Sequence, residues 1–410
     1  MECIGRSVSL KRKSPENGDN PLFSNFSLDD LNEDLFERIL SWLPTSTFFR
    51  GTSVCKRWKS VAASTSFKHA CSQIPSREPW FLMVAPNLNQ SVIFDTAESS
   101  WKRLNHPPLL HEESNQSCMP VASSGGLICH RKLSGDFIVS NPVTGSCSEL
   151  PPLHISSQNQ PLNAIVMRTA SKDQLSFRIV LVFGELPNLV FKVYNSSSGC
   201  WENETALRRK VGDIDNSMEY DSTDENAVYF LSKGGIVVAS SLQRSASKQY
   251  SSVVTNKDGN EIVYYLSSSG TVVACNLTRK CFFEHPRLLP VFSEYSIDVV
   301  ECNGEMLIVL LSEFLETASL RVWKYDEGWH QIAAMPVANS HEWFGKKADI
   351  NCVGAGNQIF VCLNSPEICT YVLCDLETNK WVELPKCCLN GEVMDFMSAF
   401  SFEPRIEASV

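Results

Sequence analysis

The stretch VYFLSKGGIVVASSL, residues 228–242, returns 35 residues later as VYYLSSSGTVVACNL, residues 263–277, and the two copies agree at nine of fifteen positions. Each copy contains two short runs rich in Val, Ile, Tyr and Leu that Gly and Ser separate, which is typical of two strands joined by a turn. An internal repeat of this kind indicates an architecture of repeated structural units.

A looser signature recurs along much of the chain. An Asn or Asp ends an apolar run, and a large residue, usually aromatic, follows six positions later. The Asx side chain can cap a polar turn, and the ring can pack between neighbouring sheets. The pairs are Asp95 and Trp101, Asn141 and Cys147, Asn195 and Trp201, Asn276 and Phe282, and Asp375 and Trp381, with a poorer match at Trp323 and Trp329 and a degenerate copy at Ser241.

The spacing of these seven markers predicts the fold. They lie 35 to 54 residues apart, mostly the period of a propeller blade. We therefore expect a β-propeller, and we prefer seven blades. One interval of 35 residues is short for four strands, so a single irregular blade, leaving six, is the alternative. The apolar run at residues 393–402 can complete the first blade and close the ring.

Ahead of the strands, the pattern changes to that of short helices. Six apolar residues between Leu31 and Leu43 fall at offsets 0, 4, 5, 8, 9 and 12 and share one helix face. Asn32 suits an N-cap. Pro44 should end this helix, and Thr45 or Ser46 can cap a second one. We expect two or three helices in all.

The size of this helical segment has a functional implication. About 45 residues cannot bury enough surface to be stable alone without a disulfide, a metal or a partner. Large apolar residues such as Phe36 and Trp58 exceed what so small a unit can enclose. We therefore expect another protein to cover part of its apolar face.

The run LDDLNEDLFERILSWLPTSTFFRGTSVCKRWKSVAASTSF resembles an F-box. It contains, in order, the Leu-x-Glu-Asp-Leu opening, the Ile-Leu-x-x-Leu-Pro turn, the Val-Cys-Lys-x-Trp helix and the terminal Phe67. The family usually has proline where this chain has Asn32. The resemblance implies a module that binds a Skp1-type adaptor, which links it to a cullin carrying a RING subunit. It implies adaptor contacts, some of which must instead hold the helices together, at Leu31, Asn32, Leu35, Phe36, Ile39, Leu43, Pro44, Val54, Cys55 and Trp58.

An F-box followed by a propeller resembles the plant F-box/kelch-repeat proteins, although the kelch double glycine is present only at Gly125-Gly126 and Gly234-Gly235. This resemblance implies the substrate-recognition subunit of an SCF-type E3 ubiquitin ligase. Propeller loops would hold an unknown target protein, and ubiquitin would come from a separate conjugating enzyme. Catalysis is then positional. The chain itself would supply no catalytic residue and would need no cofactor.

Two other functions stay open. Some kelch propellers are copper oxidases, but copper needs converging His and Tyr ligands, and the eight histidines are scattered. The 16 cysteines include no CxxC pair, so a metal site is disfavoured. The second alternative is a scaffold or a competitor for adaptor that ubiquitylates no target. Sequence does not separate it from a receptor.

Composition and charge limit the remaining possibilities. The longest aliphatic run, residues 306–311, is far shorter than the roughly 20 residues that span a bilayer, so we expect no membrane segment. Residues 1–27 lack the apolar stretch of a secretory signal, so we expect a protein of the nucleus or cytoplasm. The cluster Lys11-Arg12-Lys13 is a weak match to a nuclear signal. The net charge of −10 divides into +1 for residues 1–27, +1 for residues 28–72 and −12 beyond, which disfavours direct nucleic-acid binding.

The fold class expected is thus mostly β with a small α module. We divide the chain into a disordered tail at residues 1–27, an F-box helical module at 28–72 and a kelch-like propeller at 73–410. We also expect the helices and the propeller to bury separate cores.

Overall fold

The computed structural model describes residues 31–85, 91–104, 118–154, 160–169, 176–210, 229–231, 237–239, 251–267, 270–288, 295–314, 317–336, 341–346, 348–365, 367–389 and 391–410. The tail predicted for residues 1–27, with Lys11-Arg12-Lys13, lies outside these residues, and so does the degenerate marker Ser241. No helix of the described part is long and apolar enough to cross a membrane.

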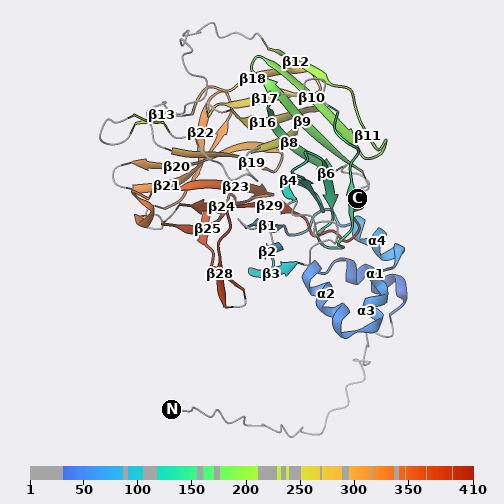
Figure 1. The fold of residues 1–410 in the computed structure, drawn as a ribbon. Coiled ribbons are helices and arrows are strands. Elements are labelled where there is room, and N and C mark those ends of the chain that lie inside the picture. Colours follow the sequence, from blue (N-terminus) through green and yellow to red (C-terminus); the bar gives the residue numbers. More distant parts are fainter. Residues whose placement is uncertain are drawn as a thin grey trace, which may run out of the picture.

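Four short helices lie together beside a large β domain (Figure 1): α1 (Glu33–Ser41), α2 (Thr45–Val54), α3 (Lys56–Val61) and α4 (Thr65–Ser72). The side chain of Asn32 accepts a hydrogen bond from the backbone N–H of Asp34 at 2.7 Å, so the predicted N-cap is confirmed. The helix count exceeds the expectation because Ser64 caps a separate last helix.

The predicted cap of the second helix is wrong. Pro44 occupies the N-cap position of α2, and no side chain caps this helix. The hydroxyl of Thr45 instead donates to the carbonyl oxygen of Pro404 at 2.7 Å, and that of Ser46 donates to the carboxylate of Asp95. Both acceptors belong to the β domain. These two hydroxyls therefore fasten the helices to the strands.

Among the described residues, the strands form four separate four-stranded antiparallel sheets and one nine-stranded sheet, which contains two further four-stranded antiparallel units. We number these six units as blades in chain order. Blade 1 contains β29 (Ser398–Phe402), β1 (Trp80–Val84), β2 (Ser91–Asp95) and β3 (Ser100–Leu104), and blade 2 contains β4 (Met119–Ser124), β5 (Leu127–Arg131), β6 (Phe137–Ser140) and β7 (Cys147–Glu149). Blade 3 contains β8 (Leu162–Thr169), β9 (Phe177–Glu185), β10 (Asn188–Asn195) and β11 (Cys200–Trp201), and blade 4 contains β15 (Ser252–Lys257), β16 (Asn260–Leu266), β17 (Val272–Asn276) and β18 (Cys281–Glu284). Blade 5 contains β19 (Tyr295–Cys302), β20 (Glu305–Phe314), β21 (Thr317–Tyr325) and β22 (Trp329–Ala334), and blade 6 contains β23 (Asp349–Ala355), β24 (Gln358–Asn364), β25 (Cys369–Asp375) and β26 (Lys380–Glu383).

The remaining elements lie outside this pattern. Strand β12 (Thr205–Arg209) pairs with β10 and with β18, so it joins the outer parts of blades 3 and 4. Two hairpins form sheets of their own: β13 (Tyr229–Leu231) with β14 (Val237–Ala239), and β27 (Cys387–Leu389) with β28 (Glu392–Met394). A 3-10 turn, η5 (His341–Trp343), connects blades 5 and 6.

The innermost strands of the blades are β29, β4, β8, β15, β19 and β23, and each contacts the next around a closed ring. Blades 3 and 4 are direct neighbours, because the hydroxyl of Ser252 donates to the carbonyl oxygen of Ile165 at 3.0 Å. The described residues therefore form six blades, and our preference for seven is wrong. Residues 229–231 and 237–239 of the first repeat copy form the hairpin β13–β14 rather than the middle of a blade.

Closure of the ring by the end of the chain is confirmed. Strand β29 pairs with β1 in antiparallel register, from Trp80 opposite Phe402 to Val84 opposite Ser398. The first blade thus combines three strands from the start of the domain with one from its end. This pairing removes an exposed sheet edge.

The recurring Asx signature has the predicted turn geometry. The side chain of Asn276, for example, accepts from the backbone N–H of Arg279 at 2.8 Å, and that of Asp375 accepts from Thr378 at 2.9 Å. In all six blades the fourth residue after the marker has a left-handed backbone: Ser99, Gly145, Gly199, Lys280, Glu327 and Asn379.

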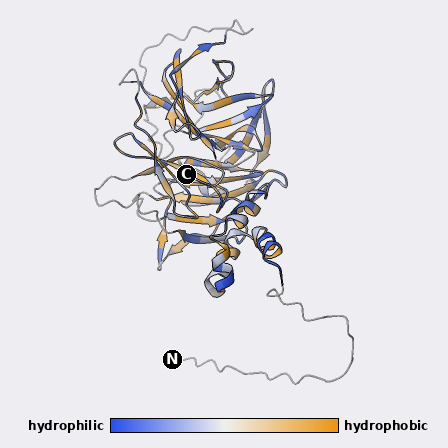
Figure 2. Cartoon of the chain, turned by 90° about the vertical axis from the view of Figure 1, so that its right-hand side faces the viewer, coloured by the Kyte–Doolittle hydropathy of each residue, from blue (hydrophilic) through white to orange (hydrophobic). Residues whose placement is uncertain are grey.

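The large residue of the signature packs against the preceding blade. The indole N–H groups of three tryptophans donate to proline carbonyl oxygens of that blade: Trp101 to Pro385 and Trp201 to Pro151, both at 2.9 Å, and Trp329 to Pro286 at 2.7 Å. Figure 2 shows hydrophobic residues along the strands. Buried apolar clusters fill the space between neighbouring blades, so the core of the domain is a ring of interfaces.

The helices and the propeller do not bury separate cores, contrary to our expectation. The buried cluster of the helices, which includes Phe36, Leu40 and Phe48, also contains Ile406. Ile406 follows the ring-closing strand β29, and its side chain is 7% exposed. One segment of the β domain therefore completes the core of the helical module.

Candidate functional site

Helix α1 exposes three large apolar side chains on one face. Leu35 is 55% exposed, Ile39 47% and Trp42 65%, at spacings of four and three residues. The adjacent side of the helix carries Phe36 and Leu40, each only 2% exposed, so the apolar stripe is not needed to fill the core of the helical module. We call Leu35, Ile39 and Trp42 the apolar stripe. A contiguous set of this kind on a soluble helix is typical of a protein-binding surface.

The other residues predicted to contact an adaptor divide into two groups. Phe36 is buried, with its ring centroid 6.3 Å from that of Trp58, and Leu31, Leu43 and Trp58 pack as half-buried residues on the same cluster. These four hold the helices together. Asn32 and Pro44 are exposed near the ends of α1, Cys55 is half-buried between α2 and α3, and the side chain of Val54 lies outside the described part of the structure.

Trp42 is a candidate that sequence reasoning missed. The F-box resemblance leaves its position open, because the Ile-Leu-x-x-Leu-Pro motif has no preference there. The available signal was helical spacing, since residue 42 lies seven positions after Leu35 and three after Ile39. Trp42 is the most exposed member of the apolar stripe.

The end of α1 is held by the linker that leads into the propeller. The guanidinium group of Arg77 donates to the carbonyl oxygens of Ser41 at 3.0 Å and of Leu43 at 3.2 Å. The last carbonyl groups of a helix have no partner within the helix, so a nearby arginine satisfies them and favours the helix dipole. Arg77 therefore positions the part of the helix that carries Trp42.

The helices sit at the propeller face where the innermost strands end. The backbone N–H of Glu403, after β29, donates to the carbonyl oxygen of Gly125, after β4, at 2.6 Å, and Thr169 at the end of β8 contacts Ser124. A cavity of about 1200 Å³ runs along the innermost strands of all six blades, and residues 42–46 and 74–80 line it as well. The helical module and its linker thus border one mouth of the central channel.

The opposite propeller face carries exposed apolar side chains. Leu133 in the β5–β6 turn is 70% exposed, Leu186 in the β9–β10 turn 39%, Val393 in the hairpin β27–β28 53%, and Met397 just before β29 37%. These turns lie at the strand ends away from the helices. This face is therefore the candidate surface for a second protein.

The buried thiols have the character of core residues. Burial raises the pKa of Cys275 and of Cys374 to about 12, so both remain neutral near pH 7. Burial among aromatic rings lowers the pKa of His285 to about 4, which keeps this imidazole uncharged. Within the described ranges, no group of three or more His, Cys, Asp or Glu side chains is arranged to hold a metal ion.

Comparison with known proteins agrees with this architecture. Residues 28–70 match the F-box domain family, and residues 93–339 match the KIB1-4 beta-propeller family. F-box only protein 13 of Arabidopsis thaliana is 53% identical, over 99% of this chain and 91% of that protein. F-box only protein 6 of the same plant is 23% identical, over 93% of this chain and 74% of that protein. The chain belongs to the F-box proteins that carry a KIB1-4 β-propeller.

The kelch label applies to more distant relatives. An F-box/kelch-repeat protein of Arabidopsis thaliana is 33% identical, but over only 37% of this chain and 38% of that protein. Within that family, the sequence brings the Hawaiian skirt protein most to mind. This narrower resemblance is not supported, because F-box only protein 13 matches nearly the whole chain.

Proposed function

We propose that this chain is the substrate-recognition subunit of an SCF-type E3 ubiquitin ligase. The helical module binds a Skp1-type adaptor, and through it the cullin and RING subunits, while the propeller holds a target protein for ubiquitylation and proteasomal degradation. The observation that carries this proposal is the apolar stripe of Leu35, Ile39 and Trp42 on the F-box. Burying side chains of this size contributes about 1.5–3 kcal/mol each to association.

Catalysis by such a protein is positional. The conjugating enzyme carries the reactive ubiquitin, and the receptor raises the local concentration of the target lysine beside it. Cys275, Cys374 and His285 are neutral and buried in the core, so these three residues are poorly placed to react with a substrate.

We place the target on the propeller face opposite the helices. The near face is partly occupied, because Thr45, Ser46 and Arg50 of α2 dock onto it, the last through an ion pair with Glu98 at 2.5 Å. The far face offers the exposed Leu133, Leu186, Val393 and Met397. A target held there stays clear of the adaptor.

Binding of purified adaptor to the full chain tests the first half of the proposal. We expect Leu35→Asp combined with Ile39→Asp to weaken binding at least 100-fold, because the stripe would have to bury two carboxylates. Leu133→Asp, on the far face, is the matched control and should bind normally. Adaptor binding that survives the double substitution would contradict the proposed contact surface.

Affinity purification from plant cells, with the proteasome inhibited, tests the second half. Recovery of adaptor, cullin and a protein enriched by the inhibitor supports receptor function. Val393→Asp should then lose the enriched protein and keep the adaptor. Recovery of adaptor alone would favour the alternative of a scaffold or adaptor competitor. We also propose the domain boundaries 28–72 and 73–410 and a location in the nucleus or cytoplasm.

A further inference from the structure

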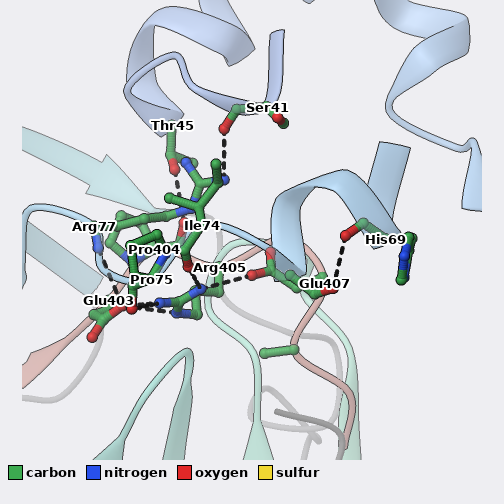
Figure 3. Close-up of polar contacts among 12 residues, drawn as sticks. Ser41, Thr45, His69, Ile74, Pro75, Arg77, Glu403, Pro404, Arg405 and Glu407 are labelled. Carbon is green, nitrogen blue, oxygen red and sulfur yellow. Dashed lines mark hydrogen bonds and ion pairs between the residues drawn. The ribbon is translucent and has the colours of Figure 1, made fainter. Parts of the chain in front are cut away.

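Residues 403–408, which we call the docking segment, contain an arginine that is almost completely buried. The side chain of Arg405 is 2% exposed. Its guanidinium group donates to the carbonyl oxygens of Ile74 and Pro75, both at 3.1 Å (Figure 3). It also forms ion pairs with Glu403 at 2.6 Å and with Glu407 at 3.0 Å. Arg405 thus joins the docking segment to the linker between the helices and the propeller.

The propeller holds the docking segment by its backbone. The side-chain amide of Asn141, a turn marker of blade 2, donates to the carbonyl oxygens of Arg405 and Ala408, both at 2.9 Å. Gly126 permits the close approach, because a Cβ atom there would lie 2.8 Å from the Cβ of Ala408 and 2.9 Å from that of Arg405. The segment is therefore fixed on the β domain independently of the helices.

The helices hold the same segment from the other side. Ile406 belongs to their buried cluster, and Thr45 donates to Pro404. Arg77 of the linker, which satisfies the end of α1, also donates its backbone N–H to the carboxylate of Glu403 at 3.3 Å. A continuous set of buried and half-buried polar contacts therefore leads from the end of the apolar stripe to the residues that follow the ring-closing strand.

We propose that Arg405 is a positioning residue for ubiquitin transfer. By tying the linker to the docking segment it fixes the orientation of the adaptor-binding helices relative to the propeller. The gain from holding a target near the conjugating enzyme depends on how few orientations the connection allows. This inference rests on the proposed function, because orientation matters for transfer only when the chain binds an adaptor and a target.

A buried arginine with two carboxylate and two carbonyl partners responds sharply to substitution. Removing it leaves Glu407, whose side chain is 4% exposed, without its positive partner. The linker carbonyls of Ile74 and Pro75 also lose their donors. Both losses fall at the joint between the two modules, whereas the blade interfaces and the apolar stripe lie elsewhere. We therefore expect the joint to loosen before either module unfolds.

The test compares the full chain with Arg405→Ala, Arg405→Lys and the control Arg209→Ala. Arg209 also forms an arginine–glutamate ion pair, with Glu284 at 3.6 Å, but its side chain is 66% exposed. Small-angle X-ray scattering of the free chain and of its complex with adaptor reports the arrangement of the modules. We expect Arg405→Ala to increase the maximum dimension, Arg405→Lys to have an intermediate effect, and Arg209→Ala to match the unaltered chain.

A second readout separates positioning from simple stability. In a reconstituted ligase without target, mass spectrometry identifies which lysines of the chain itself are modified. We expect Arg405→Ala to bind adaptor within twofold of the unaltered chain and to spread modification over more lysines. Unchanged scattering together with an unchanged set of modified lysines would overturn the proposal.

Two further arms keep the result interpretable. If Arg405→Ala does not fold, Glu407→Gln keeps the side-chain size and removes one charge partner, and the same two readouts then decide. If the unaltered chain fails to bind adaptor, the proposed function fails. Scattering of the free chain would still show whether Arg405 fixes the joint, so the two failures are distinguishable.

Discussion

The hydroxyl of Thr45 donates a 2.7 Å hydrogen bond to the carbonyl oxygen of Pro404, although the two residues are 359 positions apart in the chain. Thr45 is the first residue of α2, and Pro404 lies two residues beyond the ring-closing strand β29. The contact shows that the F-box is seated on the end of the propeller rather than attached only through its linker. Relative motion of two domains is the usual expectation unless their interface is extensive. Here a buried segment of the chain fills the joint.

Truncation of the most exposed stripe residue should weaken adaptor binding. Loss of a large aromatic side chain at the centre of an interface commonly costs about 2 kcal/mol or more. Because about 1.4 kcal/mol corresponds to a tenfold change in affinity, we expect Trp42→Ala to raise the dissociation constant at least tenfold. Isothermal titration calorimetry with purified adaptor measures this change. Circular dichroism should stay the same, since the side chain is 65% exposed. An unchanged affinity would remove Trp42 from the contact surface.

The contact between Ser46 and Asp95 predicts a shift in acid sensitivity. Burial alone would raise the pKa of Asp95, but hydrogen bonds from Lys102 and Ser46 outweigh it and hold this pKa below 3.8. A carboxylate whose pKa is lower in the folded chain than in the unfolded chain stabilises the fold at any pH above its pKa in the unfolded chain. This stability is lost as the pH falls through its pKa in the folded chain. Ser46→Ala removes one of these donors, so the pKa of Asp95 in the folded chain rises. The acid-unfolding midpoint, followed by tryptophan fluorescence, should move to higher pH.

The matched control for this change is Ser53→Ala. Ser53 is exposed on the same helix, and its hydroxyl donates only within α2, to the carbonyl oxygen of Phe49 at 3.2 Å. At pH 7 we expect Ser46→Ala to cost about 1–3 kcal/mol, as for loss of a hydrogen bond to a charged group. Equal acid midpoints for the two variants would show that Ser46 does not stabilise the ionised Asp95.

The buried His285 predicts a second pH dependence. Burial lowers its pKa from 6.5 to about 4, and its ring centroid lies 4.4 Å from that of Tyr325. The unfolded chain takes up a proton below pH 6.5 whereas the folded chain does not, so stability falls between pH 6.5 and about 4. This difference corresponds to about 3 kcal/mol. His285→Phe should reduce the dependence, as measured by urea unfolding at pH 7.5 and pH 5.

An exposed histidine provides the comparison. His69 lies on the surface of α4, so His69→Gln should retain the full pH dependence of the unaltered chain. If His285→Phe and His69→Gln lose stability equally on acidification, the titration of His285 is not the cause.

Gly354 predicts a steric limit between blades 5 and 6. A Cβ atom at this position would lie 1.9 Å from the carbonyl oxygen of Glu301 and 2.8 Å from the sulfur of Cys302. With alanine at position 354, the innermost strands β19 and β23 could not keep their present separation. We expect Gly354→Ala to destabilise the protein by about 3 kcal/mol, the upper range for overpacking. Gly328→Ala, whose Cβ would meet no atom closer than 3.9 Å, should melt like the unaltered chain.

Patterns within a short stretch of sequence predicted local structure well. The cap at Asn32 and the Asx turns depend on residues a few positions apart, and the structure confirms both. The single apolar face expected for α1 is instead divided, because Phe36 and Leu40 are buried whereas Leu35 and Ile39 are exposed. Pairing of the final apolar run with the first blade was also predictable, because closing the ring leaves no strand edge with unpaired backbone groups. The sequence therefore indicated the class of fold and two members of the apolar stripe, Leu35 and Ile39, but not Trp42.

Contacts between distant residues explain the errors. The repeat at residues 228–242 resembles blade strands in composition, but composition does not reveal that Ser252 contacts Ile165 and so closes a ring of six. Thr45 has a side chain suited to capping a helix, yet its hydroxyl donates to the backbone carbonyl oxygen of Pro404 in the β domain. Nothing near Ile406 indicates that it packs among helices encoded at the other end of the chain.

The order of synthesis gives the docking segment a further consequence. A growing chain carries α1–α4 long before residues 398–408 leave the ribosome. Until then β1 lacks its inner neighbour β29, and the helical core lacks Ile406. A chain that stops early exposes both an unpaired strand and apolar helix surface, which are features that promote aggregation. Only a chain translated through this segment completes both the first blade and the core beneath the apolar stripe, so a shortened copy lacks the support on which the proposed adaptor contact depends.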